Sequence, residues 1–473
     1  MNRLVTLIIA FCCGMLAGCS GYSRSDAPAF EVHVIRGMGE TNGDVVAVSP
    51  EGGLLIGGCF TGSLEFHDET ASDGGVTDQT SCFIARLNED YNAVNVYVWG
   101  SYHIVDLAVD ARGSLYVLSG ICQPARIIPD DPSSIVAPAG DTDLLVTKLS
   151  PDLSVEWYRA LGSAVGRDLE DYFGGIAVHQ TGEVYVAGAK RVETAVTMPP
   201  RGGMDVDSFV LKFNEKGETV WGMELSGPDK DVVDDVAVDS SGNLVVAGHF
   251  SDAVRFVSPV EEETHESQGG PDAFVIQVGP EGGIRWYRQW GGSGSVVDCR
   301  LEIGQDGSVY VGGYLGGPTA DFTPGPAVGN VGPRGDTDFF VSRFTADGEY
   351  QWTGFLGGTG TERWPAIAVD STGRIWVGGL AYNDGAHLDE PESFLGVMDA
   401  EGTALRQETW NAFDLSDMCV DEDDRLYVIG SFSETVAFGF GENRLVRQTE
   451  ELSDIYILVV DTAEGLNNSR FGV

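Results

Sequence analysis

The chain has 473 residues, a formal net charge of −44, 64 glycines and 10% aromatic residues. Such an acidic chain excludes non-specific nucleic-acid binding as a main role, because contacts to phosphates need clusters of Lys and Arg. Its length would allow two or three ordinary domains, but the glycine and aromatic content instead favours many short strands joined by tight turns.

The chain starts with an export signal. Arg3 precedes an apolar run at residues 4–16 that is too short for a stable membrane span. The run ends in Leu-Ala-Gly-Cys at residues 16–19, which resembles the lipobox of bacterial lipoproteins. This resemblance implies that residues 1–18 are a cleaved signal peptide and that Cys19 carries a lipid. The alternative is an ordinary secretory signal with a chance cysteine.

A short tether is expected at residues 19–29, which are rich in Ser, Gly and Asp. Ser20 stands where an Asp would favour retention at the inner membrane, so we expect an exported protein anchored at the outer membrane, on its periplasmic face or at the cell surface. No later apolar stretch is long enough to span a bilayer, so the lipid is the expected attachment.

Residues 30–473 form a single predicted domain built from internal repeats. The repeat begins with a short strand, a turn with glycine and a second strand, as at residues 108–117. The copies recur roughly every 60 residues, as expected of a repeat architecture. Their first residues are Ala47, Ala108, Ala177, Ala237, Glu302, Ala368 and Cys419.

Each copy continues into a second pair of strands. An acid and an aromatic residue lead into alternating apolar residues, followed by a polar turn and, in four copies, by a tryptophan. Period-two alternation bounded by Gly, Asp and Ser predicts four antiparallel strands per copy and almost no helix. A four-stranded unit cannot bury both of its faces alone, so the copies must stack around an axis. The sequence therefore predicts an all-β, seven-bladed β-propeller.

Residues 225–243 and 269–275 carry a family resemblance, with Ala237-Val238-Asp239 before the turn and Asp272-Ala273-Phe274 at the start of the third strand. They resemble the SBBP family of seven-bladed β-propeller repeats, which implies a secreted or surface protein and gives little information on function. Ser49 and Gly304 replace the usual turn Asp, and Asp424 replaces the turn Gly. Irregular hairpins are expected in those three copies.

The two ends of the domain complement each other. The last copy, at residues 454–460, is followed by a segment without the recurring tryptophan, and residues 30–36 resemble a fourth strand that lacks the first three. We expect these two strands to pair and close the ring, which removes two open sheet edges.

The aromatic and cysteine residues suggest structural roles. Trp157, Trp221, Trp286 and Trp352 recur at one repeat position, which favours packing between blades over carbohydrate stacking. Any exposed residue among the out-of-register Trp290, Trp364 and Trp410 would be the first candidate for ligand stacking. Export permits a disulfide between Cys59 and Cys82, with Cys122 as a competing partner for either, whereas Cys299 and Cys419 should be free.

A doubled acid precedes the third strand in three copies and gives weak calcium candidates. The six residues are Asp141, Asp143, Asp205, Asp207, Asp336 and Asp338. We favour turns in which the acid accepts backbone N–H groups, because no copy has the full spacing of a calcium loop. No catalytic residue, other cofactor or other metal site is predicted, since the histidines are scattered singly.

The pattern favours a non-enzymatic binding or scaffolding module for a protein or glycan. The alternative is a propeller enzyme with its site in the central channel, such as a quinone-cofactor dehydrogenase, a lyase or a hydrolase. His, Arg and acid side chains converging at the channel would favour the enzyme, and small apolar lining residues would favour binding.

Overall fold

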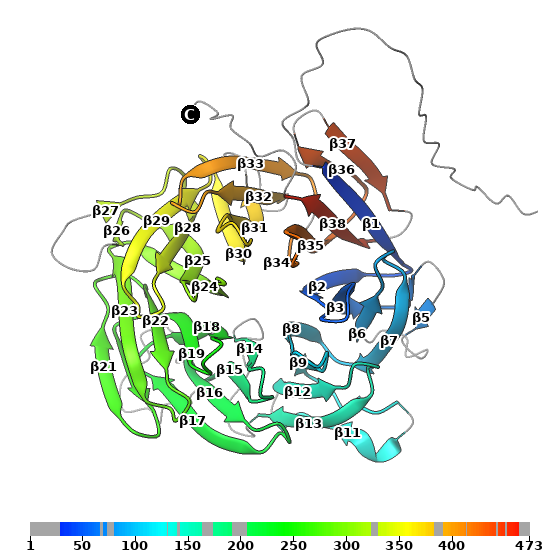
Figure 1. Ribbon diagram of the computed structural model, residues 1–473, viewed down its shortest axis with the longest axis horizontal. Helices are drawn as coiled ribbons and strands as arrows, with labels where there is room; N and C mark the ends of the chain where they lie inside the picture. The colour runs from blue at the N-terminus through cyan, green and yellow to red at the C-terminus, as the bar shows by residue number, and fades with distance from the viewer. Residues whose placement is uncertain are drawn as a thin grey trace, which may run out of the picture.

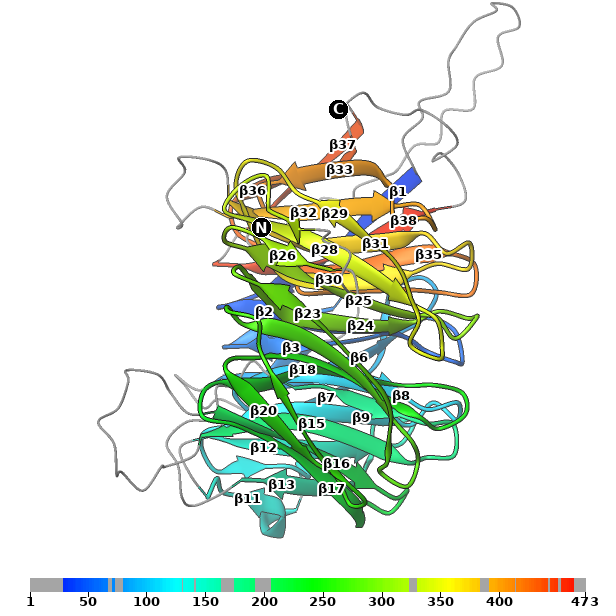
Figure 2. The ribbon, with the colours of Figure 1, turned by 90° about the vertical axis from the view of Figure 1, so that its left-hand side faces the viewer.

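The computed structural model describes residues 29–66, 70–72, 80–129, 131–139, 142–162, 174–191, 206–322, 330–382, 391–412, 414–440, 443–449 and 452–462. Within these ranges the fold is almost entirely β, apart from the single 3-10 turn η1 (Pro132–Ser134). None of the described segments forms a helix of the length and apolarity that a membrane crossing requires. Figure 1 shows the strands arranged about a central axis, and Figure 2 shows the same arrangement from the side.

The main strands form antiparallel groups of four, which we call blades and name after their innermost strand. The β2 blade contains β2 (Thr41–Val48), β3 (Leu54–Phe60), β6 (Ser81–Leu87) and β7 (Ala93–Gly100). The β8 blade contains β8 (His103–Val109), β9 (Leu115–Ile121), β12 (Asp143–Leu149) and β13 (Val155–Leu161). The β14 blade contains β14 (Ile176–Val178), β15 (Val184–Arg191), β16 (Val206–Phe213) and β17 (Thr219–Ser226).

The same order continues along the chain. The β18 blade contains β18 (Asp231–Val238), β19 (Leu244–Phe250), β22 (Asp272–Val278) and β23 (Ile284–Gly292). The β24 blade contains β24 (Ser295–Ile303), β25 (Val309–Gly316), β28 (Thr337–Phe344) and β29 (Tyr350–Leu356). The β30 blade contains β30 (Thr361–Val369), β31 (Ile375–Tyr382), β32 (Glu392–Met398) and β33 (Ala404–Trp410).

The β34 blade joins the two ends of the domain. Its strands are β34 (Asp417–Val420), β35 (Arg425–Phe432), β38 (Asp454–Asp461) and β1 (Ala29–Gly37). β1 runs antiparallel to β38, from Ala29 opposite Asp461 to Ile35 opposite Ile455. The predicted pairing of the first strand with the last repeat is therefore present, and Figure 1 shows the blue and red strands side by side.

Short hairpins occupy connections between the second and third strands of several blades. They are β4 (Ser63–Glu65) with β5 (Thr70–Ser72), β10 (Ala125–Arg126) with β11 (Ile135–Val136), β20 (Ala253–Val257) with β21 (Glu262–Glu266), β26 (Ala320–Asp321) with β27 (Asn330–Val331), and β36 (Thr435–Phe440) with β37 (Asn443–Gln448). β4, β20 and β26 also pair with the outermost strand of the preceding blade, which links successive blades at the periphery.

The hydrophobic core lies between adjacent blades. One cluster joins Val245 and Val275 of the β18 blade to Val311 and Phe340 of the β24 blade, and all four side chains are fully buried. Apolar residues occur at almost every position of the second and third strands, because both faces of these strands are covered by neighbouring blades. Each innermost strand also contacts the innermost strand of the next blade, and β34 contacts β2.

The turn after the innermost strand keeps the same backbone hydrogen bonds in all three copies whose sequence departs from the repeat. Ser49, Gly304 and Asp421 each exchange the same two backbone hydrogen bonds across this turn as Asp110 does in a regular copy. Asp424 adopts the left-handed conformation, with φ +61°, where the other copies have glycine. The prediction of irregular hairpins is wrong, because backbone hydrogen bonds define this turn and Asp tolerates positive φ better than most residues.

Candidate functional site

A cavity of about 570 Å³ lies at the centre of the blades and is lined by their innermost strands. Small side chains form part of its wall, one each from β2, β8, β14 and β18: Ala47, Ala108, Ala177 and Ala237. The equivalent repeat positions in the β24 and β34 blades carry Glu302 and Cys419, which also line the cavity. The alanines leave the space open, and Glu302 places a carboxyl group in it.

Three aspartates fasten neighbouring blades around this cavity. Asp235 on β18 accepts the N–H of Val236 at 2.7 Å through Oδ1, and through Oδ2 the N–H of Leu301 on β24 at 2.8 Å. Asp106 makes the same pair of bonds to Leu107 and to Ile176 of the β14 blade. Asp417 makes them to Met418 and to Val46 of the β2 blade. Each carboxylate satisfies one N–H from its own strand and one from the next blade.

The cavity is strongly acidic. Its described lining residues include six carboxyl groups and one guanidinium, that of Arg300; the acids are Asp44, Asp106, Asp234, Asp235, Glu302 and Asp417. Among these described residues the Glu302 carboxyl has no hydrogen-bond partner. Arg300 instead donates to the carbonyl oxygens of Cys299 at 3.3 Å and Asp234 at 3.5 Å. The carboxyl groups therefore exceed the positive charge available from the protein.

Burial raises the pKa values of several of these acids. It raises the pKa of Glu302 to about 8, with the nearby charges of Asp235 and Asp417 adding to the effect. It raises the pKa of Asp235 and that of Asp417 to about 7, and that of Asp44 to about 8. Removing a carboxylate from water disfavours its charged form unless a cation compensates. The cavity thus holds protons at neutral pH that a bound cation could replace.

A second cluster lies at the wall of the cavity. The metal-ligating atoms of Asp234, His249 and Asp298 all lie within 4.8 Å of one another. β18 carries Asp234, β19 carries His249 and β24 carries Asp298. This is the convergence of His and acid side chains that the sequence did not predict. The structure therefore combines the small lining residues expected of a binding module with the polar cluster expected of an enzyme.

The sequence contained a signal for the three blade-linking aspartates. Each stands four residues before the acid of the following turn: Asp106 before Asp110, Asp235 before Asp239, and Asp417 before Asp421. The same position in the β24 blade is Arg300, four residues before Gly304. Alignment of the copies at the turn would have found these positions, but it could not have shown that they face one cavity.

The calcium candidates do not converge within the described residues. Asp143, Asp207, Asp336 and Asp338 belong to no described group of three potential ligands, while Asp141 and Asp205 lie outside the described ranges. Asp143 accepts the N–H of Ala139 through Oδ2 at 2.7 Å, and Asp338 accepts that of Arg334. These bonds are the turn alternative that the sequence favoured, with an acid capping the chain as it enters the third strand.

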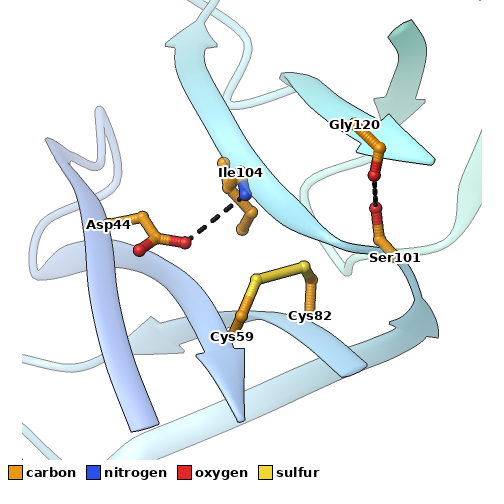
Figure 3. Close-up of a disulfide and its surroundings, with 6 residues drawn as sticks. All are labelled: Asp44, Cys59, Cys82, Ser101, Ile104 and Gly120. Atoms are coloured by element: carbon orange, nitrogen blue, oxygen red, sulfur yellow. Dashed lines mark hydrogen bonds between the residues drawn. A yellow bond between two sulfur atoms is a disulfide. The ribbon is translucent and has the colours of Figure 1, made fainter. Parts of the chain in front are cut away.

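The cysteine prediction can be checked in part. Cys59 on β3 and Cys82 on β6 form a disulfide between directly opposite residues, which confirms that pairing over the competing one (Figure 3). Cys299 and Cys419 are free cysteines, as expected. Beside the disulfide, Oδ2 of Asp44 accepts the N–H of Ile104 from the next blade at 3.4 Å (Figure 3). Cys19 lies outside the described residues.

The four recurrent tryptophans pack between blades, as predicted. Each indole N–H on an outermost strand donates to a turn carbonyl of the next blade, at 2.9 to 3.2 Å. The pairs are Trp157 with Glu215, Trp221 with Pro280, Trp286 with Ala346, and Trp352 with Ala400. A side chain added at Gly217, Gly348 or Gly402 would overlap an indole ring, so these turns sit directly on the tryptophans.

The remaining three tryptophans differ in their exposure to solvent. Trp290 and Trp410 are buried, whereas Trp364 on β30 is 53% exposed. Trp364 is also in the left-handed region, with φ +55°, at a break in the register between β30 and β31. It is not among the described residues that line the cavity. Ligand stacking by Trp364 stays a prediction.

Known proteins are similar in sequence to parts of this chain only. No family model matches the chain. The chain is 31% identical over 183 residues to the regulatory protein FlaEY of Caulobacter vibrioides, a match that covers 38% of this chain and 18% of FlaEY. It is 24% identical over 163 residues to the uncharacterized WD repeat-containing protein L264 of Acanthamoeba polyphaga mimivirus, covering 32% of this chain and 12% of that protein. The matches thus span less than a fifth of either relative.

Solved structures resemble the chain at low identity. Hydrazine synthase of Kuenenia stuttgartiensis aligns with 92% of this chain and 99% of its own, at 13% identity and a TM-score of 0.45. The Dos1 propeller aligns with 74% of this chain and 69% of its own, at 9% identity and a TM-score of 0.38. A Synechocystis apocarotenoid oxygenase mutant aligns with 91% of this chain and 94% of its own, at 9% identity and a TM-score of 0.41.

Proposed function

We propose that the chain is an exported, lipid-anchored, seven-bladed β-propeller that binds a positively charged ligand in its central cavity without transforming it. A protein partner that inserts a lysine or arginine side chain has the matching chemistry, since an alkyl stem suits the alanine wall and a cationic head suits the carboxylates. A neutral glycan would leave the acids uncompensated. The family resemblance to secreted SBBP repeats agrees with this role.

The observation that carries the proposal is the charge imbalance of the cavity. Six carboxyl groups face one guanidinium among its described lining residues, and burial raises the pKa of Glu302 to about 8. A bound cation would compensate carboxylates that the fold leaves without a counter-charge. Binding should strengthen as pH rises through 7 to 8, because the cation replaces protons on these acids.

The test is calorimetric titration of the full chain with a short lysine-containing peptide at pH 8. The same peptide with glutamine in place of lysine is the ligand control. Glu302→Gln should weaken binding about tenfold, a loss of about 1.4 kcal/mol. The matched variant Glu401→Gln changes an exposed carboxylate on a turn and should bind as the unmodified chain does. Equal binding of both peptides, or of both variants, would contradict the proposal.

The seven-bladed, closed ring can be tested through β1. Support comes from the seven-residue register between β1 and β38 and from the contact between β34 and β2. Deleting residues 29–37 should expose the β38 edge and lower the melting temperature strongly, and a synthetic peptide of residues 29–37 added in trans should restore part of it. A deletion without thermal effect would count against closure by this strand.

Lipid anchoring is a separate part of the proposal and rests on the sequence at residues 16–19. Cys19→Ser should abolish incorporation of labelled palmitate into the protein in expressing cells, because the thiol that carries the lipid is lost. Protease shaving of intact cells would distinguish the cell surface from the periplasmic face. If the serine variant incorporates as much label as the unmodified chain, anchoring through Cys19 is wrong.

A second candidate is an enzyme that works in the same cavity. The observation in its favour is Glu302, because a carboxyl group with a pKa of about 8 stays protonated at neutral pH and can donate a proton. The cavity does not fit an anionic quinone cofactor, which would meet six acids and one arginine. The enzyme alternative therefore narrows to a lyase or hydrolase. Turnover of chromogenic ester or glycoside substrates that Glu302→Gln abolishes would favour it over binding.

A further inference from the structure

Asp234, His249 and Asp298 converge at a register shift that recurs between the innermost and second strands of most blades. The register between β18 and β19 shifts between Val233 and Asp235, so Asp234 is an extra residue in its strand. The register between β24 and β25 shifts between Val297 and Arg300, so Asp298 also lies outside the regular pairing of its strand. Bulges of this kind redirect side chains. Here they place two carboxylates from neighbouring blades beside the imidazole of β19.

Backbone strain accompanies this arrangement. Asp298 has φ +54°, in the left-handed region that non-glycine residues rarely adopt. Such a conformation costs of the order of 1 kcal/mol or more and persists only where the surroundings hold it. Its side chain lies beside the hydroxyl of Tyr314 and is less buried than Asp234. The cluster therefore has two deeply buried members, Asp234 and His249, and one that is partly exposed.

One oxygen of the cluster lacks a partner. Asp234 is 1% exposed, and its Oδ2 accepts hydrogen bonds from Nδ1 of His249 at 2.8 Å and from the N–H of Cys299 at 2.9 Å. Its Oδ1 is buried and has no hydrogen-bond partner among the described residues. A buried carboxylate oxygen without a partner is costly, and a cation is the partner that suits it.

The positive charges of Arg300 and Lys230 act on Asp298. Arg300 donates hydrogen bonds to the backbone carbonyl oxygens of Asp234 and Cys299 and makes no ion pair with a described carboxylate. The ion pair of Asp234 among the described residues is with His249, which is 5% exposed. Once a metal ion has displaced the proton of His249, two carboxylates and one neutral imidazole would carry two negative charges, which match one divalent ion.

We propose that Asp234, His249 and Asp298 form a binding site for a first-row divalent metal ion, with Zn²⁺ as the ion best matched to the three ligands. Zn²⁺ accepts imidazole nitrogen and carboxylate oxygen, and three protein ligands leave a fourth position free. Because Asp234 also lines the cavity, the ion lies at the cavity wall. This site goes beyond the proposed binding of a cationic ligand at Glu302 and does not depend on it.

The test is calorimetric titration of the full, chelator-treated chain with ZnCl₂ in 0.15 M salt, a concentration that weakens binding to exposed acids. One ion should bind per chain, with release of a proton from His249. His249→Gln and Asp298→Asn should each weaken binding more than about 100-fold, since even a residue that only supports a ligand is typically worth roughly 10- to 100-fold. Equal affinity in these variants, or no binding by the unmodified chain, overturns the site.

A matched control is His265→Gln. His265 also lies next to a carboxylate, with Nε2 3.3 Å from Oε2 of Glu263, but on the peripheral strand β21. This variant should bind Zn²⁺ normally. Glu302→Gln should also retain Zn²⁺ binding, and His249→Gln should retain peptide binding, so the two proposals fail separately.

A second measurement keeps the site testable if a ligand variant does not fold. Addition of Co²⁺ to the unmodified chain should give visible absorption bands typical of mixed nitrogen and oxygen coordination, and Zn²⁺ should displace them. Circular dichroism of each variant without metal shows whether it folds. A folded Asp298→Asn variant that keeps the Co²⁺ bands would show that Asp298 is not a ligand and would overturn the three-residue site.

Discussion

Asp235 and Leu301 are joined by a hydrogen bond of 2.8 Å from the Leu301 N–H to Oδ2 of Asp235, across the boundary between the β18 and β24 blades. The other oxygen of Asp235 accepts the N–H of Val236 on its own strand. Asp106 and Asp417 repeat this arrangement elsewhere around the cavity. A carboxylate that fastens two blades and also faces the cavity links the stability of the fold to the chemistry of the site.

Asp235→Ala should destabilise the protein, because it leaves the N–H groups of Val236 and Leu301 without their acceptor. An unsatisfied buried donor costs roughly 1 to 3 kcal/mol, so a loss of about 2 kcal/mol or more is expected in urea unfolding at pH 6. Asp347→Ala, at an exposed turn, should change stability by less than about 0.5 kcal/mol. An equal effect of the two substitutions would show that the bond to Leu301 does not hold the blades together.

Because cavity acids have raised pKa values, we predict that the protein loses stability as the solution becomes alkaline. The pKa of Glu302 rises from 4.5 to about 8 on folding, and that of Asp417 rises from 3.8 to about 7. The folded chain therefore binds more protons than the unfolded chain between these limits, and the free energy of unfolding falls as pH increases through 7 to 8. We expect a higher melting temperature at pH 5.5 than at pH 8.5.

Glu302→Gln isolates the part of this effect that comes from one residue. Glutamine stays neutral, so the variant should lose less stability than the unmodified chain when both are taken from pH 5.5 to pH 8.5. One pKa unit corresponds to about 1.4 kcal/mol, so the difference between the two chains should be of the order of 2 kcal/mol. Identical pH profiles would mean that Glu302 ionises as an exposed carboxyl group does.

Trp286→Phe tests the contact between outermost strands and neighbouring turns. The substitution keeps most of the aromatic surface but removes the N–H that donates to Ala346 at 3.2 Å. A loss of about 1 kcal/mol in the free energy of unfolding is expected, and Trp286→Ala should cost more because it also removes the packing against Gly348. Trp364→Ala is the control, since Trp364 is 53% exposed. A loss at Trp364 as large as that at Trp286 would be inconsistent with packing between blades.

The disulfide between Cys59 and Cys82 should stabilise the β2 blade measurably. Its sequence separation is 23 residues, and a loop of that length predicts a loss of about 2 to 4 kcal/mol when both cysteines are replaced by alanine. Dithiothreitol should lower the melting temperature of the unmodified chain and leave that of the double variant unchanged. Sensitivity of the double variant to dithiothreitol would point to a different bridge.

The fold could be predicted from the sequence to the extent that local pattern determines it. Four-stranded units, the pairing of β1 with β38, the tryptophan contacts and the Cys59–Cys82 bridge all followed from alternation and from the spacing of the copies. The turns at Ser49, Gly304 and Asp424 were predicted less well. Their side chains differ from the repeat, but the backbone hydrogen bonds that define the turn do not depend on them.

The candidate site could not be predicted in the same way. Asp106, Asp235 and Asp417 lie in different copies, and only stacking of the blades brings them around one cavity. His249 is a single histidine in the sequence, and it approaches Asp298 only where the register shift of β18 lies beside that of β24 in the assembled blades. Convergence of residues that are far apart in the sequence depends on how the blades assemble. The sequence therefore identified these residues but could not show that their side chains lie together.

The pairing of β1 with β38 has a mechanical consequence. Any tension on the chain that precedes Ala29 reaches the domain through β1 and acts first where Ala29 lies opposite Asp461, at one end of the seam. Hydrogen bonds between these two strands would bear such a load before any other blade is stretched. The strand that joins the two ends of the domain is thus also the point at which pulling would begin to open it.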